Sequence, residues 1–255
     1  MRHQDNDLWI ARQSTRARAR LRLFCLPYAG GGARIYRTWA DALPDDVEVC
    51  AVQLPGRDQR HNETPITDAS KLIDALSVVL CPYLDMPYAL FGHSMGAVLA
   101  YELARRLGAA YDREPSGLFV SAHGAPHLPR RRPPSHHLPD DEFIARMKAL
   151  NGTPAEVFAN PELLALLLPM LRADFKLVET YAELPGPVLT CPVLAIGGRS
   201  DSDVPPTSLE GWATVTRGPF KSMLFEGDHF FINSERETLL RVLKHYLSAD
   251  YGGGS

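Results

Sequence analysis

The sequence predicts an α/β fold in which helices cover both faces of a mostly parallel central sheet. Short apolar runs that suit buried strands alternate along the chain with longer runs whose apolar residues recur at helical spacing. One strand-like run, at 88–91, passes into a helical run through only the five residues 92–96, which read Gly-His-Ser-Met-Gly. A chain of 255 residues with 45% hydrophobic residues is long enough to bury the core of one such domain.

Before residue 123, the pattern predicts four strands and three helices. The strands are expected at 22–26, 47–52, 88–91 and 117–122. The helices are expected at 35–43, at 67–80 with Thr67 as the N-cap, and directly after Ser94. Because helices separate successive strands, we expect the strands to run parallel to one another.

The alternation stops between residues 124 and 187, where prolines are dense and no strand pattern occurs. Helices are expected here at 140–150, from a capping box at 153–156, and across 163–181. Short apolar helices inserted between two strands are typical of a lid over an active site. The leucine-rich segment after 163 also suits an apolar acyl channel, and an ordinary helical subdomain is the alternative.

The α/β pattern resumes after this insertion. Strands are expected at 192–196 and 221–225, with helices at 207–215 and after a second capping box at 234–237. The predicted organisation is therefore a domain at 21–248 that contains a helical insertion at about 124–187. The polar residues 1–20 are expected to form a flexible leader, and the glycine-rich residues 249–255 a flexible tail.

Ser94 lies where a predicted strand ends and a predicted helix begins, which is the context of a nucleophile elbow. The alternative is a serine that only caps the helix. In α/β-hydrolases the nucleophile is followed along the chain by an acid and then a histidine, each after a strand. Asp201 follows the strand at 192–196 and His229 follows the strand at 221–225. The order predicts a Ser94, Asp201, His229 triad in an α/β-hydrolase fold, with Asp203 as the alternative acid.

A glycine-rich turn at 27–32 follows the first predicted strand. In hydrolases with this elbow, one oxyanion donor comes from the loop after an early strand and the other from the residue after the nucleophile. The backbone N–H groups of Ala29 and Met95 are therefore the predicted oxyanion pair. A plain tight turn is the alternative for this loop.

The overall composition argues against several classes of protein. The net charge of −3 gives no general attraction to nucleic acid. No apolar run approaches the roughly 20 residues that span a bilayer, and the N-terminus lacks a signal-peptide core. The four cysteines are far apart in sequence and no histidine pair has ligand spacing, so we expect a cytoplasmic protein without a metal or cofactor.

Several further histidines occur in the segments around the predicted site. His93 adjoins the nucleophile and is expected to pack against or orient the elbow. His123 and His127 lie where the insertion begins and are candidates to contact substrate. His136 and His137 lie in a polar, proline-rich stretch and are expected to be solvated.

Five segments carry a family resemblance: 26–31, 53–57, 92–96, 198–204 and 227–231. Together they resemble the type II thioesterases, which are stand-alone editing enzymes of polyketide synthases and nonribosomal peptide synthetases. The resemblance covers about 21–247. It implies hydrolysis of stalled or wrong acyl groups from the phosphopantetheine arm of carrier proteins, through an acyl-Ser94 intermediate and beneath a mobile lid. It carries over the same triad and the same oxyanion pair. Many relatives have histidine where Tyr28 stands, which puts details of this loop in doubt.

Carrier proteins are usually acidic, so basic residues are candidates to dock one. Arg130, Arg131 and Arg132 are the first candidates and Arg57 and Arg60 the next, with a solvated basic turn as the alternative. Competing functions are a carboxylesterase or lipase acting on free esters, a chain-terminating domain cut from a synthase, and a non-catalytic α/β-hydrolase that binds a partner. We expect a monomer, with neither nucleic acid nor a membrane as a partner.

Overall fold

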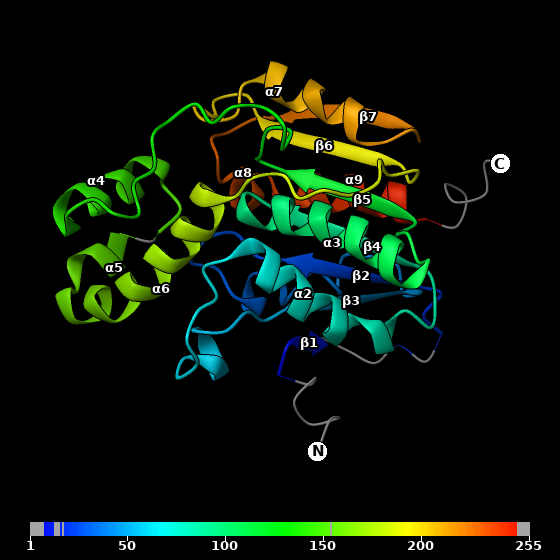
Figure 1. Ribbon diagram of the computed structural model, residues 1–255, viewed down its shortest axis with the longest axis horizontal. Coiled ribbons are helices and arrows are strands. Elements are labelled where there is room, and N and C mark those ends of the chain that lie inside the picture. Colours follow the sequence, from blue (N-terminus) through cyan, green and yellow to red (C-terminus); the bar gives the residue numbers. More distant parts are fainter. Residues whose placement is uncertain (1–7, 13–15, 17, 154, 249–255) are drawn as a thin grey trace.

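The computed structural model describes residues 8–12, 16, 18–153 and 155–248. It contains a seven-stranded sheet in the order β1-β3-β2-β4-β5-β6-β7 (Figure 1). Only the β1–β3 pair is antiparallel, and every other neighbouring pair is parallel. The strands are β1 Ile10–Arg12, β2 Leu21–Leu26, β3 Val47–Val52, β4 Tyr88–His93, β5 Gly117–Ser121, β6 Val193–Gly198 and β7 Phe220–Phe225. The predicted fold class is confirmed.

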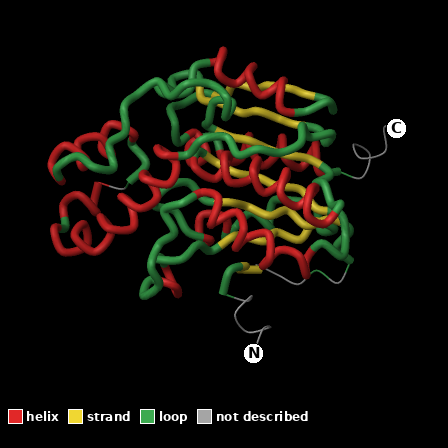
Figure 2. The backbone as a smooth tube through the Cα atoms, viewed as in Figure 1, coloured by secondary structure: helices red, strands yellow, loops and turns green. Residues whose placement is uncertain are grey.

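Helices cover both faces of this sheet (Figure 2). The helices are α2 Ala69–Leu80, α3 Met95–Tyr111, α4 Asp140–Leu150, α5 Ala155–Ala159, α6 Pro161–Thr180, α7 Pro206–Glu210, α8 Phe231–Ser234 and α9 Arg236–Leu247. Neighbouring residues of β2 face opposite sides, because side chains alternate along a strand. Phe24 packs in the core under α2 and α3, and Leu23 packs in the core under α9.

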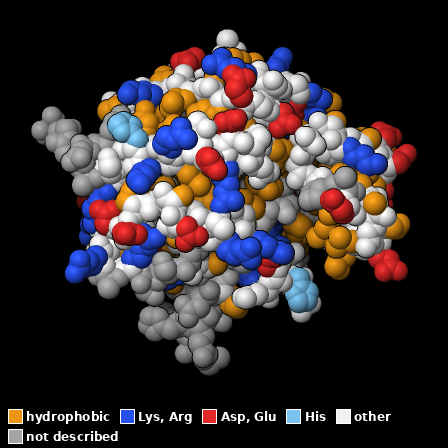
Figure 3. All heavy atoms as spheres, turned by 180° about the vertical axis from the view of Figure 1, so that it is seen from behind, with side chains coloured by type: hydrophobic (Ala, Val, Ile, Leu, Met, Phe, Trp, Pro, Cys, Tyr) orange, Lys and Arg blue, Asp and Glu red, His pale blue; other side chains and the backbone are white. Residues whose placement is uncertain are grey.

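The insertion between β5 and β6 lies beyond the carboxyl ends of the parallel strands (Figure 1). In the described part of 124–187, the secondary structure consists of the helices α4, α5 and α6. The insertion has a small core of its own, built on Phe143, Met147, Met170 and Leu171. Its outer surface is partly apolar, with Leu166 73% exposed, and Figure 3 shows hydrophobic atoms gathered over it. The carboxyl edge of the sheet, where loops carry function in such folds, is thus overhung by helices.

The predicted leader is wrong for part of its length, because Ile10–Arg12 forms the edge strand β1. This strand pairs with β3, and it buries Ile10 against the core under α2. Arg20 also donates a hydrogen bond to Asp46 at 2.5 Å. Three residues are too short for an alternating pattern to reveal a strand. The rest of the leader at 1–7, 13–15 and 17, and the predicted tail at 249–255, lie outside the described residues.

Several helix boundaries also differ from the prediction. The segment 35–43 forms a 3-10 helix at Ala33–Tyr36 followed by turns. Asp68, and not Thr67, is the N-cap of α2, where its side chain accepts a hydrogen bond from the Lys71 N–H. The capping box at 234–237 is not formed, because Ser234 ends the unpredicted short helix α8. The helix expected at 207–215 divides into α7 and a 3-10 helix at Gly211–Val215.

None of the helices in the described residues is long and apolar enough to cross a bilayer.

Candidate functional site

Ser94 occupies a strained turn between β4 and α3. Its backbone dihedrals are φ 54° and ψ −115°, a conformation that residues other than glycine rarely adopt. The flanking glycines are required by close backbone contacts. A Cβ atom on Gly92 would lie 1.9 Å from the Gly96 oxygen, and one on Gly96 would lie 2.2 Å from the Leu26 oxygen. The 92–96 motif therefore folds as a nucleophile elbow pressed against the end of β2.

The three residues of the predicted triad are connected by hydrogen bonds. His229 Nε2 lies 2.9 Å from Ser94 Oγ, and His229 Nδ1 lies 2.8 Å from Asp201 Oδ2. Asp201 follows β6 and His229 follows β7, so the strand register brings both to the elbow. The Asp201 side chain is 1% exposed, which keeps water away from its bond to the imidazole.

The other oxygen of Asp201 is also held. Oδ1 accepts hydrogen bonds from the backbone N–H groups of Asp203 at 2.8 Å and of Val204 at 3.2 Å. The Asp203 side chain points elsewhere, to ion pairs of 2.6 Å with both Arg132 and Arg146. The geometry thus favours Asp201 over Asp203 as the partner of His229.

His93 is fully buried beside the elbow. Its Nδ1 lies 2.9 Å from Ser121 Oγ, and its Nε2 lies 2.9 Å from the backbone oxygen of His229. Burial holds the pKa of His93 well below its usual value, so the ring is neutral. A carbonyl only accepts, so the single ring proton sits on Nε2 and the Ser121 hydroxyl donates to Nδ1.

The loop after β2 lies beside the elbow. Met95 is the first residue of α3, so its N–H has no acceptor within the helix. In the part of the chain that the structure describes, the Ala29 N–H has no backbone or side-chain acceptor either. Ala29 and Ser94 line the same two cavities. Both N–H groups are thus available to an oxygen atom bound near Ser94.

These two cavities meet at Ala29, Ser94 and His229. The smaller one, of about 40 Å³, is walled mainly by apolar and aromatic side chains of the insertion and core: Tyr28, Met147, Leu150, Leu171, Phe175 and Phe230. The larger one, of about 170 Å³, reaches the exposed arginines of the β5–α4 connection. One cavity suits an apolar group, and the other opens toward a basic rim.

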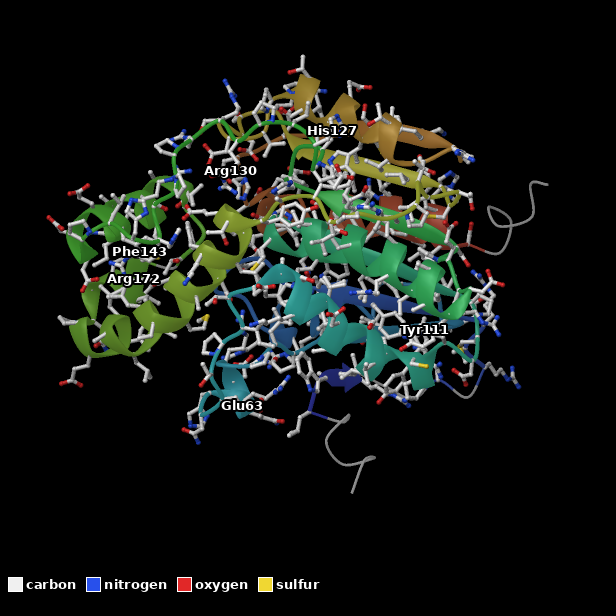
Figure 4. All side chains as sticks on the ribbon, in the orientation of Figure 1. Glu63, Tyr111, His127, Arg130, Phe143 and Arg172 are labelled. Carbon is white, nitrogen blue, oxygen red and sulfur yellow. The ribbon has the colours of Figure 1, made fainter. Side chains whose placement is uncertain are left out.

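The remaining predicted histidines lie at different depths. His123 lines the larger cavity, and burial lowers its pKa to about 4. His127 is exposed (Figure 4) and is not among the residues that line either cavity. The prediction of a solvated His136 is wrong, because its Nδ1 lies 2.8 Å from Glu179 Oε2. His137 is exposed, as the polar context predicted.

Arg57 and Arg60 are not docking residues, because both are buried. Arg57 pairs with Asp174 at 2.7 Å, with both side chains at most 5% exposed. Arg60 pairs with Glu63 at 2.5 Å and lies 3.8 Å above the Trp9 ring. No pattern in the sequence marked Asp174, a residue of α6, as the partner of Arg57. Arg130, Arg131 and Arg132 are exposed, which both a docking role and a solvated basic turn require (Figure 4 labels Arg130).

The thioesterase domain family model matches residues 21–247. The chain belongs to this family. It is a thioester hydrolase of the type II thioesterase group. The type II thioesterase BorB, from the borrelidin biosynthetic cluster, has a solved structure that is similar with a TM-score of 0.86 and 40% identity, covering 95% of this chain and 98% of BorB. The RedJ thioesterase of the prodiginine pathway in Streptomyces coelicolor is similar with a TM-score of 0.85 and 38% identity, covering 91% of this chain and 92% of RedJ.

Among curated relatives, linear gramicidin dehydrogenase LgrE of Brevibacillus parabrevis is 44% identical over 250 residues, covering 97% of this chain and 95% of LgrE. Its name describes a different chemistry from that of the thioesterase family. In the present chain, the glycine-rich turn at 27–32 lacks the G-x-G-x-x-G spacing of a dinucleotide site. The hydroxyl, imidazole and carboxylate of this site suit acyl transfer and not hydride transfer.

Proposed function

We propose that this thioesterase removes aberrant or stalled acyl groups from the phosphopantetheine arm of carrier proteins in polyketide and nonribosomal peptide synthases. The observation that carries the proposal is the hydrogen-bonded chain from Ser94 through His229 to Asp201, in a member of the type II group. BorB and RedJ, at 40% and 38% identity, come from the borrelidin biosynthetic cluster and the prodiginine biosynthetic pathway. ClbQ and YbtT, both 29% identical, come from the NRPS/PKS pathways of colibactin and yersiniabactin.

In the proposed mechanism, His229 Nε2 takes the Ser94 proton as Oγ attacks the thioester carbon. Asp201 holds the His229 proton on Nδ1 and stabilises the imidazolium. The C–S bond then breaks, and the arm leaves as a thiol after it takes the proton from His229. A water molecule attacks the acyl-Ser94 ester with His229 as the base, which releases a carboxylic acid and restores Ser94.

The oxyanion that forms in each step is proposed to accept hydrogen bonds from the Ala29 and Met95 N–H groups. Removing one such donor typically costs about 10²–10³ in kcat. Met95 is held by α3, whereas Ala29 belongs to a loop whose geometry depends on its neighbours. No cofactor is needed for this chemistry, since the phosphopantetheine belongs to the carrier protein.

The proposed partner is an acidic carrier protein that docks at the mouth of the larger cavity. Support comes from Arg130, Arg131 and Arg132, which are exposed there. Arg132 is already paired with Asp203. Arg130 and Arg131 donate to the backbone oxygens of Val178 at 2.6 Å and of Ser202 at 3.3 Å and keep further donors for a carrier's carboxylates. We further propose that the enzyme acts as a monomer in the cytoplasm. We also propose that its helical insertion serves as a lid over the active site.

Release of an acetyl group from a loaded carrier protein, followed by intact mass, tests the proposal. Wild type and Ser94→Ala are compared, with a matched acetyl oxygen ester in parallel. We expect rapid loss from the carrier, slow loss of the oxygen ester, and no turnover by the variant. An intact carrier thioester with rapid ester cleavage would instead identify an esterase with the same triad, and no turnover of either substrate would favour a binding protein.

A further inference from the structure

A buried ion pair joins the helical insertion to the core. Asp174 lies on α6 and Arg57 follows β3, 117 residues away in sequence. Arg57 Nη1 and Nη2 donate to the two carboxylate oxygens of Asp174 at 2.8 and 2.7 Å. The two side chains are 5% and 2% exposed. Such a bidentate pair fixes the orientation of both side chains as well as their separation.

The same pair holds the loop after β2. Asp174 Oδ2 also accepts a hydrogen bond from the Gly30 N–H at 2.8 Å. Arg57 Nη1 donates to the Gly31 oxygen at 2.8 Å. Gly30 has φ +81°, and a Cβ atom there would lie 2.5 Å from Leu171 Cδ2 of α6. Two consecutive residues of this loop are therefore held by one insertion carboxylate and its arginine, directly after Ala29.

Stability alone does not account for an ion pair at this position. Burying two charges costs about as much as their attraction returns, so apolar side chains of similar volume are often equally stable. Apolar side chains would not hold the Gly30 N–H and the Gly31 oxygen. What the charged pair adds is a defined orientation of the peptide groups next to the Ala29 N–H.

We propose that Asp174, clamped by Arg57, is a positioning residue that holds the Ala29 N–H in the geometry that receives the oxyanion. Asp174 thus gives its segment of α6 a role in the geometry of the site as well as in its cover. The inference rests on the proposed roles of Ser94 and Ala29.

Asp174→Asn tests the inference, because the variant keeps the side-chain shape and loses the charge. The Asp174 carboxylate accepts three hydrogen bonds, two from Arg57 and one from the Gly30 N–H. The asparagine amide has one acceptor oxygen with two lone pairs and a donor NH2 group, so it cannot accept all three, and the loop is released. Misplacement of a reacting group by about 1 Å costs up to 10²-fold, so we expect kcat for a small acetyl thioester to fall by about 10-fold to 100-fold with KM unchanged. Affinity for a trifluoromethyl ketone of matched length, which forms an oxyanion on Ser94, should fall by the same factor.

Tyr181→Phe is the matched control. It removes another contact between the end of α6 and the core, the 2.5 Å hydrogen bond from Tyr181 Oη to Glu102, and leaves the β2 loop untouched. It should leave kcat and ketone affinity unchanged. If Asp174→Asn keeps wild-type kcat and ketone affinity, or changes only the melting temperature, the positioning role is wrong.

The double variant Arg57→Met/Asp174→Leu guards against a failure of the single variant to fold. It removes both charges together, so no unpaired charge is buried. A folded double variant with reduced kcat and reduced ketone affinity supports the inference, and one with wild-type values overturns it. Ser94→Ala, measured in parallel, distinguishes a failure of the Asp174 inference from a failure of the proposed function. Activity that survives this change would overturn the proposed function itself.

Discussion

His93 Nε2 lies 2.9 Å from the backbone oxygen of His229, 136 residues away in the chain. The residue before the proposed nucleophile therefore holds the backbone of the residue proposed to activate it. This contact also explains why a fully buried imidazole is found at the elbow, since its second nitrogen is paired with Ser121. The two bonds leave the His93 ring no freedom to rotate.

His93→Phe should weaken both stability and catalysis. The variant preserves a buried ring but leaves the His229 oxygen and the Ser121 hydroxyl without their partner, which costs about 1–3 kcal/mol for each buried polar group. We expect a lower free energy of unfolding in urea and a lower kcat, because His229 is less firmly placed. His93→Gln, whose amide can donate to the His229 oxygen, should recover part of kcat. Equal kcat in the two variants would contradict a role for this contact.

Asp201 and Asp203 are separated by a pair of asparagine variants. Asp201→Asn should lower kcat by about 10⁴-fold, because the amide favours the wrong tautomer of the histidine. Asp203→Asn keeps the backbone N–H that donates a hydrogen bond to Asp201, so kcat should stay close to wild type. Steady-state hydrolysis of an acetyl thioester measures both. The reverse order of effects would make Asp203 the acid.

Two glycines of α3 should respond oppositely to alanine. Gly96→Ala places a Cβ atom 2.2 Å from the Leu26 oxygen, a backbone atom that cannot withdraw, so we expect loss of stability and of activity. Gly108→Ala places a Cβ atom 3.2 Å from Glu114 Cγ, part of a flexible side chain. Because alanine is favoured over glycine in helices by about 1 kcal/mol, Gly108→Ala should be neutral or stabilising. Thermal melting of the two variants checks this, and a stable, active Gly96→Ala would refute the close packing of the elbow.

Protonation of His123 should make stability depend on pH. Burial lowers its pKa from 6.5 to about 4, so between these values the unfolded chain binds a proton that the folded protein does not. Stability from this group is therefore complete above pH 6.5 and is lost as pH falls toward 4, at up to about 1.4 kcal/mol per pH unit.

The matched variant is His123→Asn, which keeps the backbone oxygen that accepts from Trp212 Nε1. Urea unfolding of both proteins across pH 4.5–7 isolates the contribution of His123 as the difference in slope. Parallel pH profiles in wild type and variant would show that His123 does not titrate in this way.

Arg131 should affect the protein substrate and not the small one. Arg131→Glu reverses the charge of an exposed side chain at the rim of the larger cavity. We expect a higher KM for an acetyl-loaded carrier, with a weaker salt dependence, because electrostatic attraction steers encounter. KM for a small acetyl thioester should not change. Arg241→Glu, an exposed site on α9, is the control, and an equal effect of both variants would place docking elsewhere.

The sequence by itself determined the alternation of strands and helices and the candidate site. The predicted strand at 47–52 and the predicted helix at 140–150 agree with the observed ends, because the spacing of apolar residues within each segment indicates its secondary structure. The motif at 92–96 and the order of Ser94, Asp201 and His229 after three strands predicted a triad. The structure joins these three side chains by hydrogen bonds, and their catalytic roles stay a prediction.

The tertiary structure alone decided which distant side chains meet. Asp174 with Arg57, His93 with the His229 oxygen, and His136 with Glu179 join residues whose separation in the chain carries no period. The edge strand β1 likewise depends on its antiparallel pairing with β3. Such contacts depend on strand register and helix packing, which arise from the whole fold, and no local pattern encodes them.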